Sequence, residues 1–236
     1  NNSGDISLTG NKKPQMFYRD VVWRNSKLEV LVHAPIPEGR TEVVSFWGWP
    51  DECKSWNLTG SEGKLVLVSV YSRCDSVKLE LNGKLIGIKP VSKATKLTTQ
   101  FIVPYEPGEL TAIGLTGGQE VVRQTLKTTG KPAQLTIIEE PGAAPSGQND
   151  LVYYNIEVLD ENGLLVNDAQ ISVEFEITGG GKVQAVANDN PKEMKSFQLP
   201  EVNSYRGKCQ LIVRKDKSGG EIKVTAKSNG LKSAVI

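Results

Sequence analysis

Alternation of apolar and polar residues dominates this chain from residue 28 onward. Residues 28–33 and 64–71 are short and largely apolar, whereas residues 171–177 alternate strictly. In a β-strand successive side chains point to opposite faces, so these runs have the form of buried or half-buried strands. Turn sequences rich in glycine, proline and asparagine separate them. The pattern therefore predicts an all-β fold.

The runs fall into two sets, joined by a short polar junction at residues 128–133. In the first set, Asn82 and Gly83 form a pair that favours a type I′ hairpin, because both turn residues need a positive φ. About seven short strands with regularly spaced turns are typical of an immunoglobulin-like sandwich. We therefore expect two tandem immunoglobulin-like β-sandwich domains, over residues 26–130 and 131–236.

Residues 1–25 have a different pattern. Pro14 begins a segment in which Phe17, Tyr18, Val21 and Val22 recur at a spacing of three to four residues. This pattern predicts a short amphipathic helix with proline in its first turn. The sequence shows no apolar partner for it. Its apolar side chains are expected to cause self-association or to dock this terminus on the first sandwich.

The segment from residue 43 to residue 60 is the richest in large rings, with three of the four tryptophans. Strict alternation would place Phe46 and Trp47 on opposite faces, with one ring in the core and the other exposed or covered by a neighbouring domain. A buried ring of this size removes roughly 150–250 Å² from water. Trp47, Trp49 and Trp56 are therefore candidates for carbohydrate or interdomain contact, with plain core packing as the alternative.

The second half contains one further candidate contact loop, Asn188, Asp189 and Asn190. These side chains could hold an ion or a sugar hydroxyl. The simpler expectation is a loop stabilised by side-chain-to-backbone hydrogen bonds. The sequence from Asp160 to Gly163 is expected to be a hairpin turn and not a calcium loop, because it lacks a glutamate at the required spacing.

Charge and cysteine content exclude several function classes. The 28 basic and 27 acidic residues nearly cancel, which gives no reason to expect nucleic acid as a partner. The sequence contains no run of about 18 apolar residues, so it predicts no membrane span. Cys53, Cys74 and Cys209 lack zinc-ligand spacing, and His33 lies near none of them. We expect buried thiols, no metal and no cofactor. A Cys53–Cys74 disulfide remains an alternative.

Several segments resemble family 2 glycoside hydrolases of the β-galactosidase type from gut bacteria. DISLTGNKKPQMFYRDVVW is similar to the end of their catalytic (β/α)8 barrel. VVSFWGWPDECKSWN, VKLELNGKLIG and VPYEPGELTAIG resemble the immunoglobulin-like domain that follows the barrel. ITGGGKVQAVANDNPKEMKSFQ and YRGKCQLIV resemble a further C-terminal domain. The family's glycine-rich turn is missing at residues 187–191, so any role tied to that turn is in doubt.

The resemblance implies that the chain is a C-terminal fragment and that residues 1–25 are the tail of the barrel. Hydrolysis in this family needs two carboxyl groups roughly 5 Å apart. In the family both come from barrel strands, so no catalytic residue is assigned here. The resemblance implies non-catalytic accessory domains whose partner is the catalytic barrel of the same parent chain, in a periplasmic or secreted enzyme. The alternatives are an independent carbohydrate-binding module and tandem adhesion domains.

Overall fold

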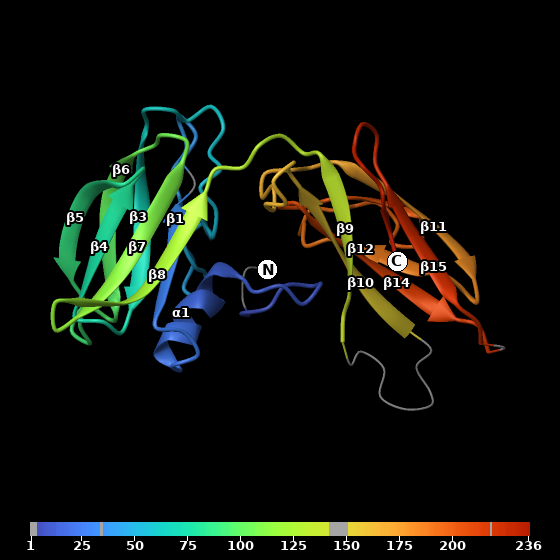
Figure 1. Cartoon of the computed structure of the whole chain (residues 1–236), viewed down its shortest axis with the longest axis horizontal. Coiled ribbons are helices and arrows are strands. Elements are labelled where there is room, and N and C mark those ends of the chain that lie inside the picture. The colour runs from blue at the N-terminus through green and yellow to red at the C-terminus, as the bar shows by residue number, and fades with distance from the viewer. Residues whose placement is uncertain (1–3, 34, 142–150, 218) are drawn as a thin grey trace. The chain divides into compact units, whose positions relative to one another are not determined.

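The chain forms two compact units, Asn1–Thr128 and Thr129–Ile236. The computed structural model describes residues 4–33, 35–141, 151–217 and 219–236. Each unit is built from two four-stranded sheets, and the named strands pair antiparallel (Figure 1). Helix α1 (Pro14–Val22) precedes the strands of the first unit. The predicted all-β class, with two tandem sandwiches and a short N-terminal helix, is confirmed.

In the first unit, one sheet has the strand order β2-β1-β3-β6 and the other has the order β5-β4-β7-β8. The first sheet consists of β1 (Leu28–His33), β2 (Glu52–Cys53), β3 (Leu65–Ser72) and β6 (Thr98–Pro104). The second consists of β4 (Ser76–Leu81), β5 (Lys84–Pro90), β7 (Glu109–Thr116) and β8 (Gln119–Lys127).

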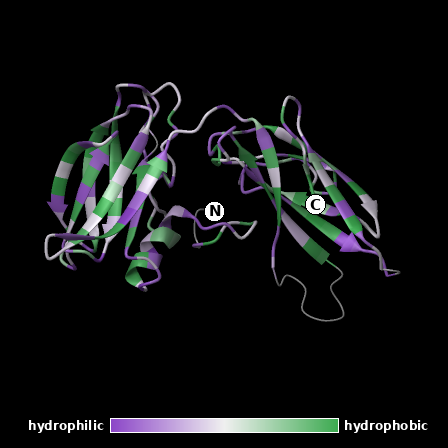
Figure 2. Ribbon diagram, in the orientation of Figure 1, coloured by the Kyte–Doolittle hydropathy of each residue, from purple (hydrophilic) through white to green (hydrophobic). Residues whose placement is uncertain are grey.

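The core of the first unit lies between these two sheets. Val30, Val68 and Phe101 of one sheet meet Leu79 and Leu110 of the other, and all five are buried. Figure 2 shows the underlying alternation as bands of apolar and polar residues along the strands. Burial of these side chains is the main stabilising contribution, because each removes apolar area from water.

The Asn82-Gly83 pair forms the predicted tight turn between β4 and β5. Its φ angles are 50° and 76°, as a type I′ turn requires. The Asn82 side chain also accepts a hydrogen bond from the Glu109 backbone N–H at 2.8 Å and donates one to the Pro107 carbonyl at 3.1 Å. The asparagine therefore fixes its own turn and the neighbouring Pro107-Gly108 turn together.

In the second unit, the sheets have the orders β12-β14-β10-β9 and β13-β11-β15-β16. The first sheet consists of β9 (Gln134–Glu139), β10 (Leu151–Leu159), β12 (Gly181–Ala187) and β14 (Lys208–Lys215). The second consists of β11 (Ser172–Gly179), β13 (Glu201–Asn203), β15 (Ile222–Lys227) and β16 (Ala234–Val235). The strict alternation in β11 places Val173 and Phe175 in the core, as predicted.

The predicted turn after β10 is organised by a buried aspartate. The Asp160 carboxylate accepts backbone hydrogen bonds from Gly130 at 2.8 Å and from Asn162 and Leu164 at 2.9 Å. Burial alone would raise the pKa of Asp160, but these backbone donors outweigh it and hold the pKa below its ordinary value. The turn is therefore fixed to the start of the second unit through a charged side chain.

We expect Asp160→Asn to destabilise the second unit at neutral pH by about 1–2 kcal/mol, because hydrogen bonds to a charged acceptor are the stronger ones. Since the folded-state pKa is depressed, the stabilisation is present above the unfolded pKa of about 4 and is lost as pH falls through the folded pKa. The difference between wild type and variant should therefore shrink in acid.

Amide hydrogen exchange in β10 and β14, followed between neutral and acidic pH, measures this difference. Asp216→Asn, at an exposed aspartate of the same unit, is the matched control and should change little. A difference for Asp160→Asn that stays constant down to the lowest pH at which the unit is folded would contradict the assignment.

Candidate functional site

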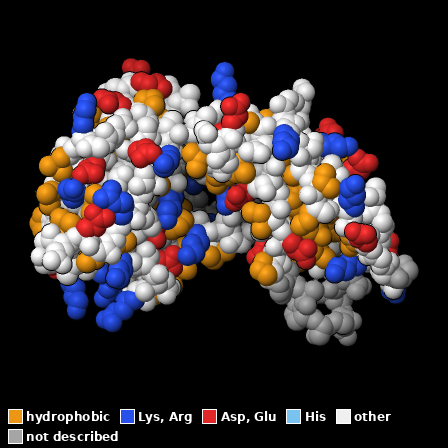
Figure 3. All heavy atoms as spheres, in the orientation of Figure 1, with side chains coloured by type: hydrophobic (Ala, Val, Ile, Leu, Met, Phe, Trp, Pro, Cys, Tyr) orange, Lys and Arg blue, Asp and Glu red, His pale blue; other side chains and the backbone are white. Residues whose placement is uncertain are grey.

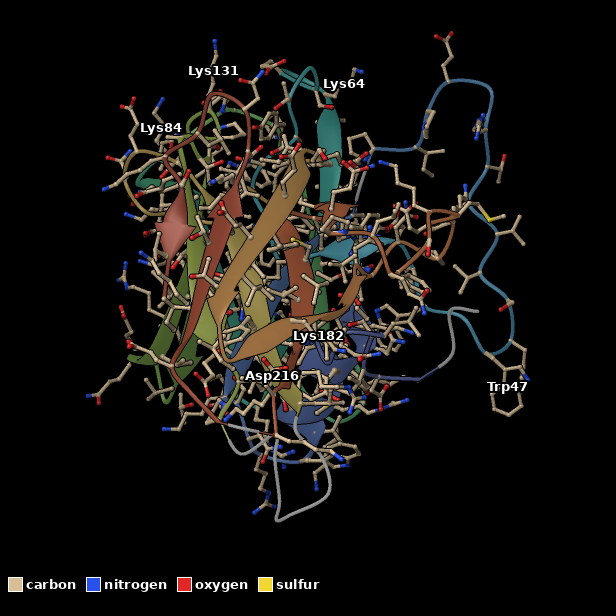
Figure 4. All side chains as sticks on the ribbon, turned by 90° about the vertical axis from the view of Figure 1, so that its right-hand side faces the viewer. Trp47, Lys64, Lys84, Lys131, Lys182 and Asp216 are labelled. Carbon is tan, nitrogen blue, oxygen red and sulfur yellow. The ribbon has the colours of Figure 1, made fainter. Side chains whose placement is uncertain are left out.

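The connection between β1 and β2 carries an exposed aromatic tip, which we define as residues 43–47. Phe46 and Trp47 have exposed fractions of 90% and 78%. Their rings pack edge to face, with centroids 4.9 Å apart and an interplanar angle of 87°. The Gly48 N–H donates to the Ser45 carbonyl at 2.8 Å and closes a tight turn beneath them. Figure 4 shows Trp47 at the outer end of this loop, away from the strands.

The expectation that one of Phe46 and Trp47 would lie in the core is wrong. It rested on strand alternation, which sorts neighbouring residues onto opposite faces. Residues 43–47 are not a strand in the structure, so the rule does not apply to them. Both rings stand in solvent and contact each other.

Trp49 lies at the base of the loop and connects it to helix α1. Its indole N–H donates to Glu52 Oε2 at 2.8 Å. Its ring lies 5.5 Å from the ring of Tyr18 on the helix and 6.2 Å from that of Tyr71 on β3. Trp49 is half-buried, so this contact leaves part of it accessible. The base of the loop is therefore fixed while its tip is free.

Glu52 is the centre of a buried polar cluster that the sequence did not reveal. The residue is 1% exposed. Its carboxylate accepts a hydrogen bond from the Trp49 indole N–H. The Tyr71 hydroxyl lies 2.9 Å from Glu52 Oε1 and 2.7 Å from Oε2 and donates to this carboxylate as well. His33 Nε2 lies 2.8 Å from both Glu52 Oε1 and Ser69 Oγ. The partners come from β1, β3 and the loop, which no local sequence pattern brings together.

These contacts set the charge state of the cluster. Burial alone would raise the pKa of Glu52, but hydrogen bonds from the surrounding side chains hold it below its ordinary value. Burial and the negative charge of Glu52 raise the pKa of Tyr71 far above its ordinary value. Glu52 is thus a carboxylate and Tyr71 a neutral hydroxyl donor at neutral pH. The arrangement holds side chains from β1, β3 and the loop in place.

Helix α1 has the partner that the sequence left unidentified. Val21 packs with Leu31 and Tyr71 on the outer face of the first sheet, and Phe17 and Tyr18 pack against this cluster. Of the two expectations for the helix, docking onto the first sandwich is confirmed. Trp23, at the end of the helix, remains exposed.

Trp56 is not a surface residue, and its place among the candidate contact residues was wrong. Its exposed fraction is 0%. The indole N–H donates to the Glu106 carbonyl at 2.9 Å, and the ring packs edge to face on Tyr105 at 5.0 Å. Trp56 closes the end of the first core and cannot offer a ring face to a sugar or to another domain.

The Asn188–Asn190 loop is held by side-chain hydrogen bonds, the simpler of the two expectations. Asn188 is buried and donates to the Asn203 carbonyl at 2.9 Å, while its Oδ1 accepts from the Asn190 N–H at 2.9 Å. Asn190 Oδ1 in turn accepts from the Lys192 N–H at 3.0 Å. In the described residues, no group of three or more His, Cys, Asp or Glu side chains could hold a metal ion. Asp189 keeps its candidate role as a prediction.

The cysteines and the surface charges are the remaining features that the sequence drew attention to. Cys74 and Cys209 are buried free thiols, so the alternative Cys53–Cys74 disulfide is not formed. Burial raises the pKa of Cys209 to about 12. Acidic and basic side chains are interspersed over the visible surface (Figure 3). In the part of the chain that the structure describes, no helix has the length and apolar character needed to cross a membrane.

Two family models match the chain. Residues 135–236 match the glycoside hydrolase family 2 C-terminal domain 5. Residues 63–122 match a domain of unknown function. The two matches lie in the second and the first unit, respectively.

Similar proteins are much longer than this chain. A β-galactosidase, BoGH2A of Bacteroides ovatus, is 33% identical over 181 residues, which are 77% of this chain and 21% of the relative. A protein of Formosa agariphila named as a putative β-glucuronidase is 31% identical over 89% of this chain and 19% of its own length. The crystal structure of a family 2 member from Bacteroides cellulosilyticus superposes with a TM-score of 0.91 and 34% identity, over 100% of this chain and 31% of that one.

Proposed function

This chain belongs to the C-terminal part of the family 2 glycoside hydrolases, and on that premise we propose that it is a non-catalytic accessory region that braces the catalytic barrel of its parent enzyme. The observation that carries the proposal is the superposition with TM-score 0.91 over the whole chain, which covers 31% of a family 2 enzyme. Both units and the helix find counterparts together, as expected of one continuous region of a larger protein.

The geometry of the buried carboxylates supports a structural role. A retaining glycoside hydrolase needs two carboxyl groups roughly 5 Å apart, flanking an accessible bond. In the first unit Glu52 is occupied by three donors, Glu29 pairs with Lys54 at 2.6 Å, and Asp20 pairs with Lys12 at 2.6 Å. Each of these carboxylates pairs with a donor of the same chain, which supports a structural role for it.

The parent is proposed to hydrolyse β-linked galactosides, with β-glucuronides second, because curated relatives carry both names. Residues 1–25 would be the tail of its catalytic barrel, and α1 would connect that barrel to the first sandwich. The resemblance to enzymes of gut bacteria supports a periplasmic or secreted location, which fractionation of the native host would test.

A turnover assay tests the non-catalytic role. The purified chain, incubated with chromogenic β-galactosides and β-glucuronides, should show no hydrolysis above buffer, whereas the full-length parent should cleave one of the two. Hydrolysis that copurifies with the chain through several columns, and persists in independent preparations, would overturn the proposal.

A second candidate function rests on the exposed ring of Trp47. If the chain were an independent carbohydrate-binding module, it would bind galactans or host glycans saturably in calorimetry. That binding should be lost in Trp47→Ala with the fold intact. Asn188, Asp189 and Asn190 lie in the other unit, and the same titrations with Asp189→Ala would test the sugar contact proposed for that loop.

A further inference from the structure

We infer that the aromatic tip, residues 43–47, is a preformed docking surface for the remainder of the parent enzyme, and that Glu52 holds the base of the loop in position for it. This inference rests on the accessory role proposed above. It goes further by assigning the contact to a specific surface of the first unit and by naming the residue that positions it.

The composition of the tip supports a docking role. Single exposed apolar side chains are common on soluble proteins, but a contiguous exposed aromatic cluster marks a contact site. Phe46 and Trp47 pack against each other, and Val43, three residues earlier in the sequence, is also exposed. By contrast, Leu65 and Ile102 are exposed aliphatic side chains on strands of the first sheet.

The fixed base of the loop also supports a docking role. Trp49 is bound to Glu52 and packs on Tyr18, and the Asp51 N–H donates to Glu42 Oε1 at 2.6 Å across the loop. A surface held in its binding conformation loses little conformational entropy when it docks. Glu52 binds the base of the loop through Trp49, so its role is that of a positioning residue.

The size of the tip indicates an intramolecular partner. Two large rings bury roughly 150–250 Å² each, far below the roughly 1,200 Å² of a typical stable complex between separate proteins. A second copy of this chain would therefore be held weakly by this surface. A partner in the same polypeptide is present at high effective concentration, so a small apolar contact is sufficient.

The position of the loop base agrees with that partner. The family model that matches residues 135–236 describes a C-terminal domain, and about two thirds of the solved relative lies outside the match. The remainder of the parent would then join the chain ahead of α1. Because Trp49 packs on Tyr18 of α1, the base of the loop and this helix lie on one face of the first unit.

A flat sugar platform fits the tip less well than a protein recess does. The ring of Phe46 stands at 87° to that of Trp47, so the two rings do not form one flat surface. Such a pair has an irregular apolar surface that matches a shaped recess lined by apolar side chains. We therefore assign the tip to the remainder of the enzyme and treat carbohydrate as an outcome that would contradict it.

The test uses the full-length parent with Phe46→Ser and Trp47→Ser combined. The matched control is the pair Leu65→Ser and Ile102→Ser, two exposed apolar residues of the same unit. In the parent, the tip variant should be cleaved within residues 35–51 by a nonspecific protease at least tenfold faster than wild type. In the isolated chain, the same substitutions should leave the unfolding midpoint unchanged.

Glu52→Gln in the parent tests the positioning role and should also speed cleavage of the loop, while the tip remains intact. Equal cleavage of wild type and tip variant would overturn the inference. So would concentration-dependent dimerisation or saturable galactan binding of the isolated chain that the tip substitutions abolish. If the isolated chain is inert but the tip substitutions change nothing in the parent, the docking surface fails while the accessory role stands.

Discussion

Trp56→Ala is expected to lower the free energy of unfolding of the first unit by about 3–5 kcal/mol, the usual cost of removing a large buried ring. Trp56 is completely buried, and its indole N–H is bonded to the Glu106 carbonyl. The substitution removes the packing against Tyr105 and leaves that carbonyl without its donor. A domain stabilised by about 5–15 kcal/mol loses a large share of its margin.

Tryptophan fluorescence during urea unfolding measures this loss selectively, because all four tryptophans lie in the first unit. Trp47→Ala is the matched control, since it removes the same side chain at a position that is 78% exposed. The control should change the unfolding free energy by less than about 0.5 kcal/mol. Equal effects of the two substitutions would contradict the assignment of Trp56 to the core.

Glu52→Ala is the second large effect, at about 3 kcal/mol for the first unit. The substitution removes the acceptor of the Trp49 indole N–H and the Tyr71 hydroxyl, and each buried donor left unsatisfied costs about 1–3 kcal/mol. It also removes the contact with His33. We expect the loop to lose its fixed base, so protease cleavage within residues 35–51 should accelerate in the isolated chain as well.

Glu29→Ala separates this effect from the general loss of a buried carboxylate. Glu29 is also buried, but its partner Lys54 is partly exposed and can reach water once the carboxylate is gone. The control should cost about 1 kcal/mol or less and leave loop cleavage unchanged. If Glu29→Ala and Glu52→Ala have the same effect on cleavage, Glu52 is not the anchor of the loop.

Much of the fold could be predicted because apolar and polar residues alternate along each strand that has one buried face. Residues 171–177 alternate and place Val173 in the core, and the Asn82-Gly83 pair fixes its hairpin through positive φ angles. Leu97 shows where this reasoning ends. Alternation with Thr99, Phe101 and Val103 would place it in the following strand, but its φ is 57° and β6 begins at Thr98.

The helix partner could have been anticipated from one feature. Residues 28–33 form a short apolar run, which indicates a strand covered on both faces. In the structure Val30 faces the core, while Leu31 faces α1 on the other side. The apolar face of the helix therefore packs on the second apolar face of this strand.

The candidate site could be predicted only in part. The ring density of residues 43–60 indicated the right segment, but composition cannot distinguish Trp56, which closes the core, from Trp47, which stands in solvent. Glu52 had no signal at all, because its partners His33 and Tyr71 come from other strands and meet it only after the sheet forms. Such clusters depend on tertiary contacts.

The most direct test of the account compares backbone hydrogen exchange of residues 43–47 in the isolated chain and in the full-length parent. In the isolated chain the tip is exposed, so its amides should exchange rapidly. In the parent, a tip docked against the remainder of the enzyme should exchange at least tenfold more slowly, and Phe46→Ser with Trp47→Ser should abolish that protection. Equal exchange of the tip in both proteins would contradict the account.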